Sequence, residues 1–155
     1  MAIRSTNRKS RGLAALRTGA EVVTYEYWMF KEGLRWLASL KGVSSAPSQA
    51  AMNAAIEVTL IHARNLLDFF AAGGRPNDVK MHDFLSFPPR IALPYLRKNR
   101  KRMNRKLAHP SYSNSRMSSS WDFAAIEAEI DKAIARFVKR LARDEPKLRR
   151  LFPIP

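Results

Sequence analysis

Apolar residues recur at helical spacing along most of the chain, and two such stretches lie in its first half. The first predicts an amphipathic helix over about residues 18–40, because its large apolar residues follow 4-3-4-3 spacing: Val23, Tyr27, Phe30, Leu34 and Leu37. The second, over about residues 48–72, has a seam of the same spacing (Ile56, Leu60, Ala63, Leu67 and Phe70) and a second apolar patch (Val58, His62, Leu66 and Phe69). A helix that is apolar on two faces usually lies in the centre of a bundle.

A long connection is predicted over residues 73–93. Gly73 is a natural C-terminal cap for the second helix. The stretch Phe84-Leu-Ser-Phe87 is expected to supply apolar anchors to the core, and the Pro88-Pro89 pair excludes regular helix there.

Two further helices are predicted in the second half of the chain. The third is expected over Pro94–His109, with a thin apolar stripe of Leu96, Met103 and Leu107. The fourth is expected to open at Ser119 or Ser120, to carry Asp122 in its first turn and to end at Pro146. Its seam is Phe123, Ile126, Ile130, Phe137 and Leu141.

These segments predict an all-α protein, a four-helix bundle with a long loop between helices 2 and 3. The chain of 155 residues is long enough for one domain with its own core. We expect a basic flexible arm over residues 1–17, the helical bundle domain over 18–145 and a basic, Pro-ended tail over 146–155. Because two helices have more apolar surface than one small bundle needs, a homodimer is expected.

The charge of the chain is strongly basic and unevenly distributed. It has 28 Lys and Arg against 13 Asp and Glu, a formal net charge of +15. Residues 1–20 hold five Lys or Arg and no acid, and residues 84–121 hold nine and no acid. Such a surface attracts polyanions, so RNA or another polyanion is the expected partner.

The composition also excludes several classes of protein. The chain has no cysteine, which rules out disulfides, thiolate metal sites and a cysteine nucleophile, and fits a reducing compartment. Charged and amide side chains interrupt its most apolar stretch, residues 50–72, so neither a membrane span nor a membrane partner is expected. We expect a cytoplasmic protein, because the first residues lack the apolar run of a secretory signal. The alternative to a disordered basic arm there is an organellar transit peptide.

The densest basic run, Arg97–His109, contains the main candidate site. On a helix, Arg102, Arg105 and His109 fall on one stripe, because side chains three or four residues apart share a face. A metal-free RNA-cleaving site needs an acid/base that titrates near neutral pH and a cation for the charge that develops on phosphorus. His109 as acid/base and Arg102 as charge stabiliser are therefore the catalytic candidates. The alternative is a solvated basic helix with a C-terminal histidine cap.

The other basic residues of this run are candidates for binding nucleic acid through its phosphates: Arg97, Lys98, Arg100, Lys101, Arg105 and Lys106.

A second polar group lies on the second predicted helix, where Arg64, Asn65 and Asp68 form a polar stripe. Arg64 is expected to pair with Asp68 at i+4 as a structural ion pair. The alternative places Arg64 and Asn65 at a cleft that faces the third helix. His62, on the apolar side, is expected to be a hydrogen-bonded core residue rather than a ligand.

The remaining candidates carry weaker signals. Asp78, His82 and Asp83 match no strong metal motif, and the chain has no Gly-rich phosphate loop, so neither a metal nor a cofactor is expected. The aromatic residues of the first helix are expected to lie in the core or at an interface: Tyr25, Tyr27, Trp28 and Trp36.

Two segments together resemble small uncharacterised bacterial helical proteins: His62-Ala-Arg-Asn-Leu-Leu-Asp-Phe-Phe70 and, about forty residues later, Asn104-Arg-Lys-Leu-Ala-His109. Those proteins are similar in turn to the HEPN superfamily (higher eukaryotes and prokaryotes nucleotide-binding). The resemblance covers roughly residues 20–141. It implies an α-helical bundle that is commonly dimeric. Many members are metal-independent ribonucleases of toxin–antitoxin and phage-defence systems, and others are non-catalytic RNA-binding or scaffold modules.

The family's catalytic signature is an arginine, four to six residues, and a histidine. In this chain Arg102-Met-Asn-Arg-Lys-Leu-Ala-His109 matches it with six residues between. Met103 departs from the pattern, since the residue after the arginine is usually polar.

The leading hypothesis is an HEPN-like RNA-binding protein that acts through its third helix and basic arm, with metal-independent RNA cleavage by His109 and Arg102 as its catalytic form. The alternative is a non-catalytic helical module that binds nucleic acid. A third hypothesis is an interaction protein whose charge serves solubility or an acidic protein partner.

Overall fold

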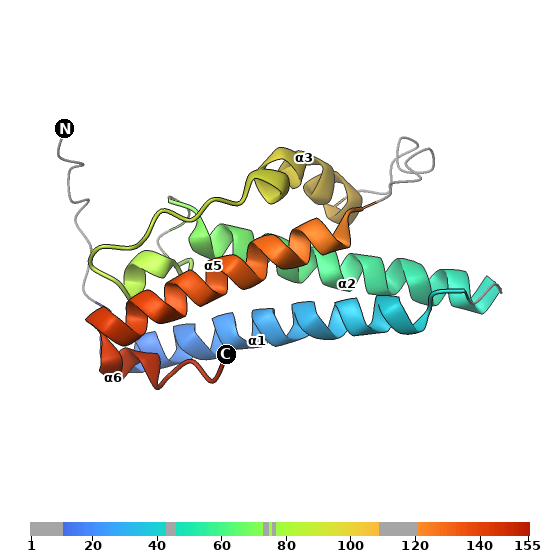
Figure 1. Cartoon of the computed structure of the whole chain (residues 1–155). Coiled ribbons are helices and arrows are strands. Elements are labelled where there is room, and N and C mark those ends of the chain that lie inside the picture. Colours follow the sequence, from blue (N-terminus) through green and yellow to red (C-terminus); the bar gives the residue numbers. More distant parts are fainter. Residues whose placement is uncertain (1–10, 43–45, 73–74, 76, 109–120) are drawn as a thin grey trace.

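The computed structural model describes residues 11–42, 46–72, 75, 77–108 and 121–155. Within them the long helices are α1 (Leu13–Ser39), α2 (Ala46–Phe70), α3 (Pro94–Ala108) and α5 (Phe123–Asp144) (Figure 1). A 3₁₀ turn, η1 (Met81–Asp83), lies in the connection before α3, and a short helix, α6 (Pro146–Arg149), follows α5. The predicted all-α fold, a four-helix bundle with a long connection between the second and third helices, is confirmed.

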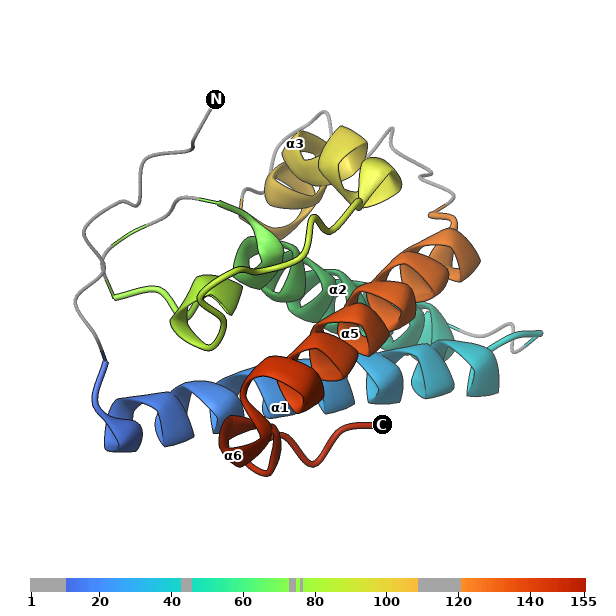
Figure 2. The same ribbon diagram turned by 60° about the vertical axis from the view of Figure 1, so that its left-hand side comes forward.

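Helices α1 and α2 form a long antiparallel pair, which α5 crosses (Figures 1 and 2). The pair approaches closely at Gly33, where a Cβ atom would lie only 3.1 Å from the Cα of Thr59. A larger residue at position 33 would therefore push the two helices apart. Helix α3 packs against both α2 and α5.

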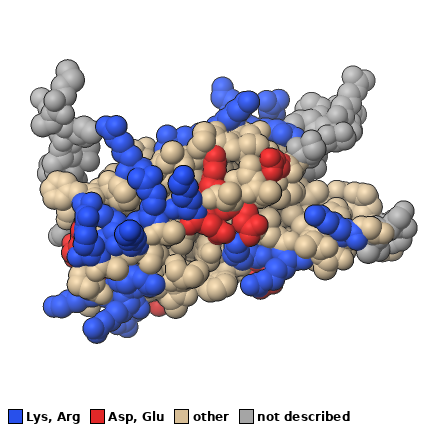
Figure 3. All heavy atoms as spheres, in the orientation of Figure 1, with Lys and Arg blue, Asp and Glu red and all other residues tan. Residues whose placement is uncertain are grey.

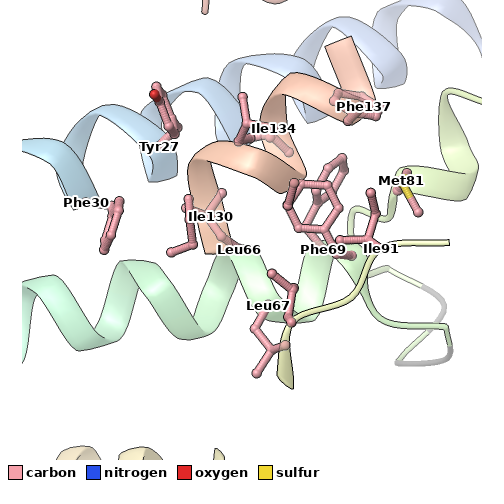
Figure 4. Close-up of a cluster of buried hydrophobic side chains, with 14 of the residues drawn as sticks. Tyr27, Phe30, Leu66, Leu67, Phe69, Met81, Ile91, Ile130, Ile134 and Phe137 are labelled. Atoms are coloured by element: carbon pink, nitrogen blue, oxygen red, sulfur yellow. The ribbon is translucent and has the colours of Figure 1, made fainter. Parts of the chain in front are cut away.

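The core is built from the predicted seams and is rich in aromatic rings (Figure 4). The ring centroid of Phe137, on α5, lies 5.3 Å from that of Phe69 on α2 and 6.3 Å from that of Phe84 in the connection. It also lies 5.1 Å from the ring of Phe152, which follows α6 and is fully buried. Edge-to-face contacts at such distances add to the apolar area that these rings bury.

The last residues of the chain belong to the bundle rather than to a separate tail. Besides the burial of Phe152, Ile154 is only 3% exposed. The Arg149 guanidinium donates to the carbonyl oxygen of Ile154 at 2.9 Å and to that of Phe152. Residues 146–155 thus pack back onto the helices.

A polar link joins α1 to α5. The Lys31 ammonium donates to Glu127 and, at 3.0 Å, to Asp131, and the Tyr27 hydroxyl donates to Asp131 at 3.2 Å. Burial alone would lower the pKa of Lys31, but the hydrogen bonds to Glu127 and Asp131 outweigh it and raise that pKa. Burial and the charge of Asp131 raise the pKa of Tyr27.

Several predicted helix ends differ from those observed. Helix α1 begins at Leu13, so residues 13–17, expected in the flexible arm, are helical. Leucine, alanine and arginine, which make up this stretch, are good helix formers. Gly12, directly before it, is a poor one, so the helix begins after Gly12. Asp122 is the N-cap of α5, accepting a hydrogen bond from the Ala125 amide at 2.9 Å, and does not lie inside the first turn. Pro146 opens α6, in the first helical position that proline tolerates.

The predicted anchor stretch of the connection is confirmed at its start and wrong at its end. Phe84 is 2% exposed and Leu85 is 1% exposed, and both pack in the core. Phe87, at the end of the stretch, is 78% exposed. The predicted cap at Gly73, the opening serines of the fourth helix and residues 1–10 of the arm lie outside the described residues.

Candidate nucleic-acid interface

Helix α3 turns its basic residues outward, as the periodicity predicts. Leu96 and Met103 are fully buried. On the opposite side Lys98, Lys101 and Arg105, spaced 3-4, are exposed and share one face. We call these three residues the α3 stripe. Arg97 is also exposed, and Lys106 lies within the helix.

The N-terminus of α3 is held by a carboxylate from α5. Glu129 accepts hydrogen bonds from the backbone amides of Tyr95, at 2.8 Å, and Leu96, at 3.1 Å. Because α3 has no acidic residue of its own, this carboxylate supplies the negative charge that stabilises a helix N-terminus. The Tyr95 hydroxyl in turn accepts from the Asp122 amide at 3.0 Å. These bonds fix the position of α3 along α5.

A salt bridge holds the other side of α3 to α2. The Arg100 guanidinium lies 2.6 Å from the Asp68 carboxylate, and Lys80 donates to the Asp68 carbonyl at 2.7 Å. The predicted Arg64–Asp68 pair is therefore wrong. Asp68 pairs across the helices with Arg100, and Arg64 donates to its neighbour Asn65 at 3.2 Å. A residue predicted to bind nucleic acid, Arg100, thus has a structural partner.

Arg102 packs against the start of α5. Its guanidinium carbon lies 4.1 Å from the ring centroid of Trp121, a cation–π contact, and Trp121 is only 8% exposed. Arg102 therefore lies on the side of α3 that faces α5, next to the α3 stripe. Its predicted catalytic partner, His109, follows Ala108 directly but lies outside the described residues.

Asn65 turns away from α3 and joins a polar network between α1 and α2. One oxygen of Glu26 accepts from the Nδ1–H of His62, at 2.6 Å, and from the Asn65 side-chain amide, at 3.0 Å. The side chains of His62 and Glu26 are only 11% and 16% exposed. The prediction that His62 is a hydrogen-bonded core residue is confirmed, and the idea that Asn65 faces α3 is wrong.

Two of the polar contacts between helices had no signal in the sequence. Glu26 and His62 are 36 residues apart, and Glu129 and Tyr95 are 34 apart. Each pair depends on how two helices cross, which the spacing within either helix does not specify.

The acidic residues of the connection between α2 and α3 pair with basic side chains rather than with one another in a cluster. Asp83 lies 3.1 Å from the Arg11 guanidinium, and Asp78 lies 3.5 Å from the Lys80 ammonium. The backbone amide of Arg75 and the charge of Lys80 lower the pKa of Asp78. Within the described residues no group of three His, Asp or Glu side chains is suited to a metal ion. Nor is any helix in that part of the chain long and apolar enough to cross a membrane.

Comparison with models of known protein families, with curated proteins and with solved structures gives no significant match.

Proposed function

We propose that this protein binds RNA and that α3 is its main contact with the phosphate backbone. The observation that carries the proposal is the α3 stripe, Lys98, Lys101 and Arg105, exposed on one face of a helix that has seven Lys or Arg and no acid. Lysine and arginine on a rigid helix can replace the counterions condensed on a nucleic-acid backbone, and the release of those counterions drives binding.

The anchoring of α3 supports the same proposal. Glu129 at its N-terminus and the Arg100–Asp68 salt bridge hold the helix at two points. A helix that is already positioned loses little conformational freedom when a phosphate backbone binds. The two anchors also leave the α3 stripe outside the bundle.

The proposal is tested by replacing the α3 stripe with glutamine, as Lys98→Gln, Lys101→Gln and Arg105→Gln in one protein. Affinity for a fluorescently labelled single-stranded RNA should fall about tenfold or more. The dependence of log K on log salt should become shallower by about 0.7 for each phosphate that the variant no longer neutralises. The matched control is Arg35→Gln, Lys41→Gln and Arg75→Gln, three exposed bases outside α3 and outside the basic arm. Equal affinities in the two triple variants would contradict the proposal.

We propose in addition that the protein cleaves the RNA that it binds, with His109 and Arg102 as the catalytic residues. This proposal is supported by the position of Arg102, which lies over the ring of Trp121 and less than two helical turns before α3 ends at Ala108. The test is incubation of the purified protein with labelled RNAs beside its His109→Ala variant, without added metal. We expect the unsubstituted protein to cleave RNA and the His109→Ala variant to leave it intact. RNA left intact by both proteins would exclude ribonuclease activity.

We also propose that two copies of the chain associate through the outer face of α1 and α2. Most exposed large apolar side chains of the described residues lie on these helices: Leu13, Val22, Tyr25, Trp28, Trp36 and Ile61. The ring of Tyr25 contacts that of His62, next to Ile61, so the patch continues from α1 to α2. Together the two helices carry four Lys or Arg and five Asp or Glu, so two copies can meet there without strong repulsion.

Sedimentation equilibrium at low salt tests the dimer. A dimer is expected, and Tyr25→Glu with Trp36→Glu should convert it to a monomer that still binds RNA. A protein that stays monomeric at every concentration would contradict this part of the proposal. Co-purification with an acidic protein on that face would instead favour an interaction module.

A further inference from the structure

Helix α5 has a second basic stripe, outside the run from Arg97 to His109. Lys132, Arg136, Lys139 and Arg143 are spaced 4-3-4 and all four are exposed. The spacing puts them on one face, opposite the buried seam of Ile126, Ile130, Phe137 and Leu141. At 1.5 Å per residue this α5 stripe extends along about 16 Å of helix. Exposed Lys147 and Arg150 continue it beyond α5.

Three acids of α5 bind groups on other helices. Glu127 and Asp131 bind Lys31 of α1, and Glu129 holds the N-terminus of α3. These acids therefore link α5 to its neighbours, while the bases of the α5 stripe face solvent. Figure 3 shows the outcome, with Lys and Arg gathered over the C-terminal half of α5 and α6, a second group over α3, and acids between them.

The α5 stripe has few acids to offset its charge. Asp144 lies 2.7 Å from Arg143 and also pairs with Arg140, at the end of the stripe. Lys132, Arg136 and Lys139 are neighbours at i+3 and i+4, and like charges at this spacing repel. A bound polyanion would relieve the repulsion, whereas a merely solvated stripe would retain it.

We propose that the α5 stripe is a second phosphate-binding surface and that one RNA chain contacts α3 and α5 together. The inference rests on the proposed function, because it extends the RNA site of α3 to another helix. Glu129 fixes the spacing between the surfaces, since it joins the N-terminal third of α5 to the start of α3. Two linked contacts bind a long chain much more tightly than either alone, but a short RNA reaches only one of them.

The test compares two single-stranded RNAs of mixed sequence, about 8 and about 30 nucleotides long, which bracket the usual site sizes of single-strand-binding domains. The variant is Lys132→Gln, Arg136→Gln and Lys139→Gln, and the control is the Arg35, Lys41 and Arg75 triple variant, which loses the same charge. Arg143 is left in place because it pairs with Asp144. The α5 variant should lose about tenfold affinity for the long RNA and much less for the short one. Its melting temperature should equal or exceed that of the unsubstituted protein, because repulsion within the stripe is removed.

Each result separates the inference from the function on which it rests. If the α5 variant binds the long RNA as tightly as the control variant, while the unsubstituted protein binds RNA, the second surface is wrong and the α3 site stands. The same loss for both RNA lengths would also overturn the two-surface arrangement. If the unsubstituted protein binds neither RNA at low salt, the proposed function itself fails.

Discussion

The α1–α2 pair and α3 use polar side chains in opposite ways. In the pair, bases and acids nearly balance, and Glu26 of α1 accepts hydrogen bonds from both His62 and Asn65 of α2. On α3 there are seven bases and no acid, and the carboxylates that hold the helix come from Glu129 and Asp68 of other helices. The α1–α2 pair thus adds almost nothing to the net charge of +15, whereas α3 has seven bases and no acid. Polar groups of the pair stabilise the fold, whereas Lys98 and Lys101 of α3 are exposed on its outer face.

Among the substitutions that distinguish the α1–α2 pair from α3, Glu26→Ala should cause the largest loss of stability. It removes the acceptor for both His62 and Asn65 in a poorly exposed site and should destabilise the protein by about 3 kcal/mol. Glu26→Gln, which keeps one acceptor oxygen, should cost much less. Urea unfolding measures the stability of both variants. At temperatures where they are folded, both should bind RNA with unchanged affinity. A loss of RNA affinity in the folded variants would mean that the pair contributes to the site.

A smaller loss of stability, joined to a loss of binding, is expected from Glu129→Ala. Without this carboxylate two amides at the start of α3 lose their acceptor, which should cost about 2 kcal/mol. Because α3 then loses its fixed position on α5, RNA affinity should fall as well, unlike in Glu26→Ala. Thermal unfolding and fluorescence anisotropy on the same samples check both effects. Unchanged RNA affinity would show that anchoring α3 is irrelevant to binding.

Arg102→Ala should cost about 1 kcal/mol, the contribution of a cation–π contact with a mostly buried ring. Arg102→Lys keeps the charge but not the planar group that stacks on Trp121, so it should recover part of the stability. Intrinsic fluorescence of the protein should report the change around Trp121. If Arg102→Ala is as stable as the unsubstituted protein, the contact with Trp121 does not hold α3.

The smallest expected effect is a dependence on alkaline pH. The pKa of Lys31 is raised in the folded protein above its ordinary value of 10.5, so its contribution to stability is fully present below that value. The contribution is lost as the pH rises through the folded pKa. The free energy of unfolding is measured from neutral pH to pH values above the ordinary pKa of lysine. In Lys31→Met it should fall less at alkaline pH than in the unsubstituted protein. Identical pH profiles for both proteins would contradict the role given to the Lys31 link.

Local periodicity was sufficient to predict the helices but not their partners. The seams of α1, α2 and α5 could be predicted because apolar residues at 3-4 spacing must share a face, and most of these residues are buried. Arg64 and Asp68, four residues apart, satisfied the same local rule, yet Asp68 binds Arg100 from another helix. A contact within one helix competes with contacts across the bundle, and only the crossing geometry decides between them.

The candidate site was predicted in part for the same reason. The outward face of α3 follows from its buried Leu96 and Met103, so the exposure of Lys98 and Lys101 could be predicted. The α5 stripe could have been predicted in the same way from the seam of its helix. It is less conspicuous in the sequence, because its bases are more widely spaced along the chain than those of the run before His109. The contacts of Glu129 could not be predicted, because nothing along α5 indicates that α3 begins beside it.

The most direct test of the central claim is a titration of isotope-labelled protein with single-stranded RNA, followed by amide chemical shifts. The shifts should concentrate on α3, with Lys98, Lys101 and Arg105 among the most affected, and should weaken as salt is added. Amides around Glu26 and His62 should hardly change. Shifts concentrated on the outer face of α1 and α2, with α3 unaffected, would contradict the claim that α3 is the surface that binds RNA.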